Sequence, residues 1–133
     1  MNKDDDKTWR LVDANLNRLK EGIRVIEDIA RYLNDDASLA SKLKNIRHKC
    51  KIDNYANIIK SRDSVNDVLK TSTSSEMQRS DINSILIANY KRTQESARVL
   101  EEIFKIFDPM LSDRFKKIRY ELYTLEKNNL TNL

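Results

Sequence analysis

The sequence is poor in the residues that make tight turns, covalent cross-links and metal clusters. Its 133 residues include one glycine (Gly22), one proline (Pro109), one cysteine (Cys50) and one histidine (His48). This argues against β-sandwiches, β-barrels, Rossmann units and P-loops, which need glycine for positive φ or for close backbone approach to phosphate. One cysteine excludes an internal disulfide and a structural zinc cluster, and one histidine excludes a histidine-based metal site within the chain.

Long hydrophobic runs and a strong excess of one charge are also missing. No apolar run approaches the roughly 20 residues of a membrane-spanning helix, and the polar start at residues 1–7 is unlike a secretory signal. The 25 lysines and arginines only slightly outnumber the 21 aspartates and glutamates, and this net charge of +4 suits a small anion as well as a nucleic acid. We expect a cytoplasmic protein, not embedded in a membrane, with residues 1–133 forming one domain.

Apolar residues at helical spacing predict an all-α bundle of two antiparallel helical hairpins. The apolar stripes run through residues 12–33, 39–50, 82–107 and 110–125. Asp108-Pro109 supplies an N-cap and a first-turn proline for the last helix. Residues 55–59 are expected to form a separate short turn. The hydroxyl-rich residues 60–80 predict a long polar loop, which is either a disordered linker or a functional loop.

The third predicted helix repeats the first one 74 residues later. Between residues 14–29 and 88–103, eight of sixteen positions are identical, and most of the identities are polar. We therefore expect duplicated halves, about residues 9–52 and 81–127, related by a pseudo-twofold axis. Shared packing explains matching apolar residues only, so the matching polar residues need a second reason.

The repeated polar residues are the first candidates for a site. They are two asparagines, four arginines and four glutamates: Asn15, Arg18, Glu21, Arg24, Glu27, Asn89, Arg92, Glu95, Arg98 and Glu101. Each asparagine lies on the apolar stripe, so its amide either fixes the helix register or contacts a ligand in a polar cavity. The charged residues recur at every third position, which fits a surface ladder of ion pairs. Alternatively the arginine forks hold phosphate or carboxylate, with Arg18 and Arg92 flanking the helix seam.

The polar loop carries the second group of candidates. Arg62-Asp63 and Asp67 bracket a short segment, which Glu76 and Arg79 close. Carboxylates four residues apart beside an arginine suit magnesium together with phosphate, because the metal prefers hard oxygens and the anion a guanidinium. The same residues also fit a solvated linker without any site.

Several separate motifs lie in order along the chain. They are residues 12–18 (VDANLNR), 21–28 (EGIRVIED), 47–48 (RH), 62–63 (RD), 67–68 (DV), 88–92 (ANYKR) with Glu95, 98–102 (RVLEE) and 119–123 (RYELY). Together they resemble the small helical hydroxymethylpyrimidine-phosphate kinase of thiamine biosynthesis, which occurs alone or as an N-terminal extension of thiamine-phosphate synthase. The resemblance runs from about Trp9 to Lys127. It implies a glycine after Asp67-Val68, where this sequence has Leu69-Lys70.

The resemblance implies a stand-alone kinase that phosphorylates hydroxymethylpyrimidine phosphate to its diphosphate, with ATP as co-substrate and Mg²⁺ as the metal. For that reaction we predict catalytic roles for Arg18, Arg92 and Asp63, and Asp63 and Asp67 as magnesium ligands. The predicted substrate- and nucleotide-binding residues are Asn15, Glu21, Arg24, Arg62, Asn89, Glu95 and Arg98. The expected partner is a small-molecule substrate, with a functional link to thiamine-phosphate synthase.

Two other functions stay open on the sequence. One is a helical enzyme that acts on another small anion without ATP, and the other is a non-enzymatic binding or regulatory module. A nucleic-acid partner is not expected, because the repeated positions alternate in sign and form no basic stripe. The sequence leaves open whether the chain forms a homodimer, whether a site lies within or between chains, and which half binds the nucleotide.

Overall fold

The protein is all-helical, as the apolar spacing predicts. The computed structural model describes residues 6–74 and 76–131, and these residues form helices and irregular segments without any strand. The polar start, on which the expectation of no leader depends, lies mostly outside the described residues. In chain order the helices are α1 (Asp6–Asp28), the π-helical turn η1 (Ile29–Leu33), α2 (Ala37–Lys49), α3 (Tyr55–Ser61), α4 (Ile82–Phe107) and α5 (Pro109–Leu130).

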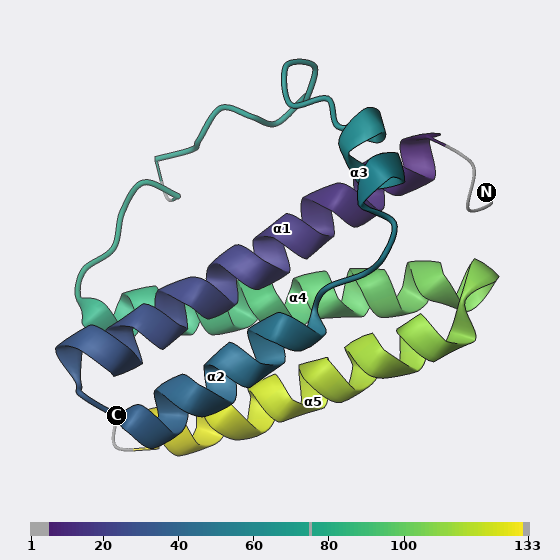
Figure 1. Cartoon of the computed structure of the whole chain (residues 1–133). Coiled ribbons are helices and arrows are strands. Elements are labelled where there is room, and N and C mark those ends of the chain that lie inside the picture. Colours follow the sequence, from purple (N-terminus) through teal and green to yellow (C-terminus); the bar gives the residue numbers. More distant parts are fainter. Residues whose placement is uncertain (1–5, 75, 132–133) are drawn as a thin grey trace.

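The helices α1, α2, α4 and α5 pack lengthwise, with the short α3 against the N-terminal part of α1 (Figure 1). The helices α1 and α2 form one hairpin, and α4 and α5 form the other (Figure 1). The described parts of the loop, residues 62–74 and 76–81, then lead from α3 back over α1 to the start of α4 without a regular element (Figure 1). In the part of the chain that the structure describes, no helix is long and apolar enough to cross a membrane.

Aspartates begin three of the helices. A side-chain oxygen of Asp36 accepts from the amide of Leu39 at 3.0 Å, and Asp81 caps α4 with a reciprocal Ser84 contact. Asp108 caps α5 by accepting from the amide of Leu111 at 3.1 Å, just before the proline in the first turn. Each cap satisfies an amide that the first turn of a helix leaves without a backbone partner.

The hydrophobic core lies between the helices of the two hairpins. Its fully buried side chains are Val12, Leu19, Ile23, Ile26, Leu43, Cys50, Tyr90, Ala97, Leu100, Phe104, Phe115 and Leu122. The helices α1 and α4 approach each other closely at Gly22, where an added Cβ would lie 2.6 Å from Cγ2 of Thr93. This crossing therefore requires the absence of a side chain at position 22.

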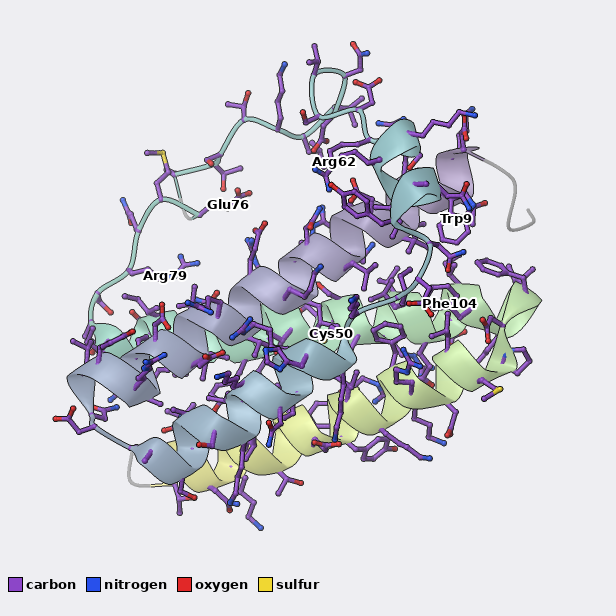
Figure 2. All side chains as sticks on the ribbon, in the orientation of Figure 1. Trp9, Cys50, Arg62, Glu76, Arg79 and Phe104 are labelled. Atoms are coloured by element: carbon purple, nitrogen blue, oxygen red, sulfur yellow. The ribbon has the colours of Figure 1, made fainter. Side chains whose placement is uncertain are left out.

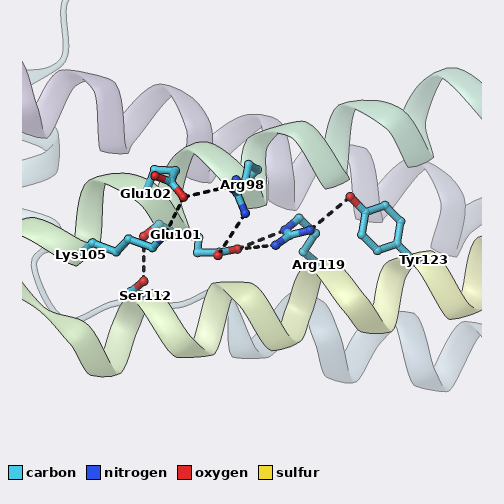
Figure 3. A network of polar contacts seen from close by, with 7 residues as sticks. All are labelled: Arg98, Glu101, Glu102, Lys105, Ser112, Arg119 and Tyr123. Atoms are coloured by element: carbon cyan, nitrogen blue, oxygen red, sulfur yellow. Dashed lines mark hydrogen bonds and ion pairs between the residues drawn. The ribbon is translucent and has the colours of Figure 1, made fainter.

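Each hairpin contains one buried glutamate that pairs with an arginine on its second helix, and the two glutamates are 74 residues apart. Arg47 on α2 donates to both oxygens of Glu27, at 2.7 and 3.2 Å. Arg119 on α5 donates twice to one oxygen of Glu101, at 3.1 and 2.8 Å (Figure 3). Glu27 is 2% exposed and Glu101 4%. The interpretation of both as members of an exposed ladder is therefore corrected, because both lie on the buried stripe and pair across helices. Glu101 also lies 3.4 Å from Arg98, three residues earlier, which is a pair that the ladder predicts.

The repeated asparagines also make the same contact. The amide of Asn15 donates to the carbonyl of Leu11, and that of Asn89 to the carbonyl of Ile85, each at 2.9 Å. Recurrence of a polar contact at the repeat distance is what a duplication leads one to expect. The pseudo-twofold relation of the two halves itself stays a prediction.

Candidate functional site

A buried aspartate on α1 holds the end of α3 and the start of the loop. Asp13 is 6% exposed although it carries a charge. Arg62 donates to its two oxygens at 2.7 and 2.9 Å, and Asn17 donates to one of them at 3.1 Å. The hydrogen bonds that Arg62 donates to Asp13 raise the pKa of Arg62. A charge is tolerated at this depth because it is paired and hydrogen-bonded.

The loop folds into a small turn directly after Arg62. Figure 2 labels Arg62 at the point where α3 ends and the loop begins. The Asp63 carboxylate accepts from the side-chain amide of Asn66 at 2.8 Å and from its backbone amide at 3.1 Å. These hydrogen bonds lower the pKa of Asp63. Arg10 of α1 reaches the carbonyl of Asp63 at 3.4 Å, and Asp67 accepts from the amide of Leu69 at 3.0 Å. The turn therefore holds the carboxylates of Asp63 and Asp67 near α1.

A cavity of about 420 Å³ lies between this turn and α1, and we call it the polar cavity. It is lined by Lys7, Arg10, Leu11, Asp13, Ala14, Asn17, Arg18, Arg62, Asp63, Ser64 and Asp67. Four of the predicted site residues meet here: Arg18, Arg62, Asp63 and Asp67. Four cationic side chains and three carboxylates around one hollow suit a phosphate group accompanied by a cation.

A second cavity, of about 530 Å³, lies on the other side of the Asp13–Arg62 pair, and we call it the apolar cavity. It is lined by Asp13, Leu16, Asn17, Lys20, Arg47, His48, Lys51, Ile52, Tyr55, Ile58 and Arg62. Asp13, Asn17 and Arg62 thus line both cavities and form the wall between them. None of the apolar cavity's aliphatic or aromatic residues was a sequence-based candidate.

A third cavity, of about 510 Å³, lies where the loop approaches the seam of α1 and α4, and we call it the seam cavity. It is lined by Asn15, Arg18, Leu69, Glu76, Arg79, Ala88, Lys91, Arg92, Glu95, Ser96 and Val99. Figure 2 shows Glu76 and Arg79 on the stretch of loop that leads to α4. The predicted residues Asn15, Arg92 and Glu95 meet here, and Arg18 lines both this cavity and the polar one.

The other sequence-predicted residues lie apart from these hollows. Of the described residues, Glu21, Arg24, Asn89 and Arg98 line none of the three cavities. Arg24 lies 3.4 Å from Asp28, its i,i+4 neighbour. Arg98 lies 3.4 Å from an oxygen of Glu101 (Figure 3). These two arginines therefore act as helix-surface ion-pair partners in this structure, and a role in ligand binding stays a prediction.

The residues around the polar cavity could hold magnesium together with a phosphate ligand, but not by themselves. Among residues 6–74 and 76–131, no group of three or more histidine, cysteine, aspartate or glutamate side chains forms a metal site. Asp63 and Asp67 nevertheless line the same cavity. Magnesium is commonly bound by one or two carboxylates together with substrate phosphates. The donor set thus suits a cation that arrives with a phosphate ligand.

Three residues that line the cavities were not among the sequence-based candidates: Asp13, Asn17 and Tyr55. The sequence contained a signal for Asp13 and Asn17. Asp13 directly follows Val12, a residue of the apolar stripe, and Asn17 lies one helical turn after Asp13. A charged residue on a buried stripe needs a partner. No comparable pattern marked Tyr55, since the packing of α3 on α1 brings together residues about 40 positions apart.

Comparison with known proteins gives a consistent result over nearly the whole chain. A family model described as the ThiD2 family matches residues 10–128. Proteins named thiamine-phosphate synthase are similar to the chain: that of Nostoc punctiforme is 36% identical over 121 residues, 90% of this chain and 34% of the relative. That of Synechocystis is 36% identical over 122 residues (91% and 36%), and that of Rhodopirellula baltica 39% over 119 residues (86% and 32%). The chain thus spans about a third of the length of these relatives. No solved structure matches it.

Proposed function

The chain belongs to the ThiD2 family, and from this premise we propose that it phosphorylates hydroxymethylpyrimidine phosphate with ATP in thiamine biosynthesis. The observation that carries the proposal is the polar cavity, in which Arg18 and Arg62 lie with Asp63 and Asp67. The chain has one glycine, so a glycine-rich phosphate loop is not available. Side-chain cations must then supply the positive charge that a P-loop draws largely from backbone amides.

In the proposed reaction, an oxygen of the pyrimidine monophosphate attacks the γ-phosphorus of ATP. The bond from that phosphorus to the bridging oxygen breaks, ADP leaves with the bond's electron pair, and the pyrimidine diphosphate forms. The attacking oxygen needs no general base, because the second pKa of a phosphate monoester is about 6. The protein has to bring two anions together, which is work for arginines rather than for a histidine.

Asp13 orients the guanidinium group of Arg62 for phosphate binding. Two of its five N–H groups are directed at Asp13. The remaining three are available to phosphate oxygens, and the pairing fixes the plane of the guanidinium before a ligand arrives. Holding a donor in place in advance lowers the cost of reorganisation during the reaction.

Asp63 and Asp67 would hold Mg²⁺, which neutralises negative charge on the phosphates that it contacts. The hydrogen bonds from Asn66 keep Asp63 ionised. Arg18, which lines the polar and the seam cavity, would contact phosphate oxygens from the α1 side. The proposed product also fits the relatives' name, since a thiamine-phosphate synthase would consume an activated pyrimidine.

The proposal is tested by following product formation directly. Purified protein is incubated with ATP, Mg²⁺ and the pyrimidine monophosphate, and ³¹P NMR follows the appearance of the diphosphate and ADP. Arg18→Ala is expected to lower kcat/KM by at least tenfold, because one charge-assisted phosphate contact contributes about 1.5–3 kcal/mol. Arg31→Ala is the matched control, since Arg31 is an exposed arginine on η1, directly after α1, and lines none of the three cavities. Equal rates in both variants would contradict the phosphate assignment of the polar cavity.

A further inference from the structure

The apolar cavity has the walls of a site for a flat ring. Its floor is made by the buried side chains of Leu16, Ile52 and Ile58. Tyr55 stands beside them, yet it is 67% exposed, so its ring face is accessible to a ligand. An accessible aromatic ring next to an aliphatic hollow is the usual arrangement for stacking a heteroaromatic base.

The rim of the same cavity is cationic. Arg47 lines it but is committed to Glu27 through two hydrogen bonds. Lys20 and Lys51 also line it, and over the described part of the chain neither forms an ion pair. An ammonium group without a carboxylate partner suits a phosphate monoester that carries no metal.

The two cavities therefore differ in what they can accept. The polar cavity contains Asp63 and Asp67, whose negative charge opposes a bare phosphate and favours one that arrives with a cation. The apolar cavity has Asp13 as its one acidic residue among those described, and Asp13 is neutralised by Arg62. This contrast favours a nucleotide with its metal in the first cavity and a metal-free monophosphate in the second.

The wall between the cavities places the two sites next to each other. Asn17 lies in this wall and donates to Asp13. Its side-chain carbonyl accepts no hydrogen bond from the described residues, so it is open to an amino group on a bound ring. Arg62 borders both hollows, and its remaining N–H groups can contact phosphate on either side.

We propose that the apolar cavity is the binding site for the aminopyrimidine ring and monophosphate of the substrate, with the ring stacked on Tyr55 and the phosphate at Lys20 and Lys51. This assignment rests on the proposed function. The shared chemistry, a heteroaromatic ring with phosphate, also describes an adenine nucleotide, and the test below distinguishes the two sources.

The test measures binding separately for each ligand. Isothermal titration calorimetry follows the pyrimidine monophosphate and the free alcohol, each without nucleotide. A second series follows a non-hydrolysable ATP analogue with Mg²⁺. The variants are Tyr55→Ala and Lys51→Ala, and the matched control is Tyr32→Ala, because Tyr32 is 62% exposed and lies outside the cavity. Both test residues are exposed, and circular dichroism verifies that each variant is folded.

We expect Tyr55→Ala to weaken binding of the pyrimidine monophosphate by about tenfold, the size of one lost stacking contact. Lys51→Ala should weaken binding of the monophosphate more than that of the free alcohol. Neither variant should change binding of the ATP analogue, and Tyr32→Ala should change nothing. Weaker binding of the ATP analogue to Tyr55→Ala would assign the cavity to adenine and overturn the inference, as would unchanged binding of both ligands.

These binding data, together with the ³¹P NMR assay of diphosphate formation, separate this inference from the proposed function. If the wild type binds the monophosphate through Tyr55 but forms no diphosphate, the kinase function fails and the binding site stands. If it forms diphosphate and Tyr55→Ala binds the monophosphate as tightly as the wild type, the function stands and the site assignment fails. If the wild type does not bind the monophosphate at all, both are overturned.

Discussion

The replacement of Gly22 by alanine tests how closely α1 and α4 approach each other. In the middle of an exposed helix this change stabilises a protein by about 1 kcal/mol, because alanine restricts the unfolded chain. Here the new Cβ would lie 2.6 Å from Cγ2 of Thr93, about 1 Å inside an ordinary carbon–carbon contact. Thr93 cannot simply rotate away, since it is fully buried, stiff at χ1 and donates to the carbonyl of Tyr90 at 2.7 Å.

The expected magnitude follows from these opposing effects. Overpacking of a buried contact costs about 1–3 kcal/mol, so Gly22→Ala should lower the free energy of unfolding by about 1 kcal/mol after the helix-propensity gain. Thr93→Ser removes Cγ2 and keeps the hydroxyl, at a cost of about 1 kcal/mol for one buried methyl group. In the double variant the new Cβ occupies the vacated space, so the two changes should couple favourably by about 2 kcal/mol.

The assay is urea denaturation followed by far-UV circular dichroism on the four proteins of the double-mutant cycle. As a control, Gly22→Ala is combined with Thr124→Ser, since Thr124 is exposed on α5, and these two changes should be additive. A stabilising Gly22→Ala, with no coupling to Thr93→Ser, would refute the close approach of α1 to α4 at this point.

Three further predictions concern buried charges and the buried thiol. Glu101→Gln should lower the free energy of unfolding by about 3 kcal/mol, because its partner Arg119 on α5 stays buried without a counter-charge. Glu95 is exposed, so Glu95→Gln should change the free energy of unfolding by less than about 0.5 kcal/mol. Urea denaturation measures both. Burial raises the pKa of Cys50 from 9.0 to about 12, so the folded protein loses stability as the pH rises from 9 towards 12, where the unfolded thiol ionises first. Urea midpoints at pH 8 and 10.5 should fall less in Cys50→Ala than in the wild type, and an equal fall would contradict this origin. Asp13→Asn should release Arg62 and lower kcat/KM for diphosphate formation at least tenfold with unchanged helical content, and wild-type kinetics would contradict the positioning role of Asp13.

Local sequence signals predicted most of the helical framework. The apolar stripe over residues 82–107 coincides with α4, and Asp108-Pro109 begins α5 as expected. These features depend on spacing of 3 or 4 residues and on caps, both of which are local. The first stripe was predicted to continue to Leu33, but its last turn is the π-helical η1, a change of hydrogen bonding that apolar spacing does not encode.

The candidate site was predicted only in part, because it depends on contacts between distant residues. Repeat matching identified Arg18, and the loop motif identified Arg62 and Asp63, which the polar cavity brings together. Neither pattern indicated that Arg62 pairs with Asp13, which lies 49 residues earlier in the chain. Nor did it show that α3 forms one wall of an apolar hollow containing Tyr55. Helical periodicity assigns a residue to a face but does not say which loop covers that face.

The most direct test of the proposed kinase is ADP release from the purified chain with ATP and Mg²⁺, compared between the pyrimidine monophosphate and the unphosphorylated alcohol. A site that clamps an existing phosphate leaves its cations unpaired when the alcohol binds, so turnover with the alcohol should be slower by about 10⁴-fold. We expect ADP release with the monophosphate and almost none with the alcohol. Absence of ADP release with either compound would contradict the kinase function, and equal rates with both would contradict the phosphate clamp.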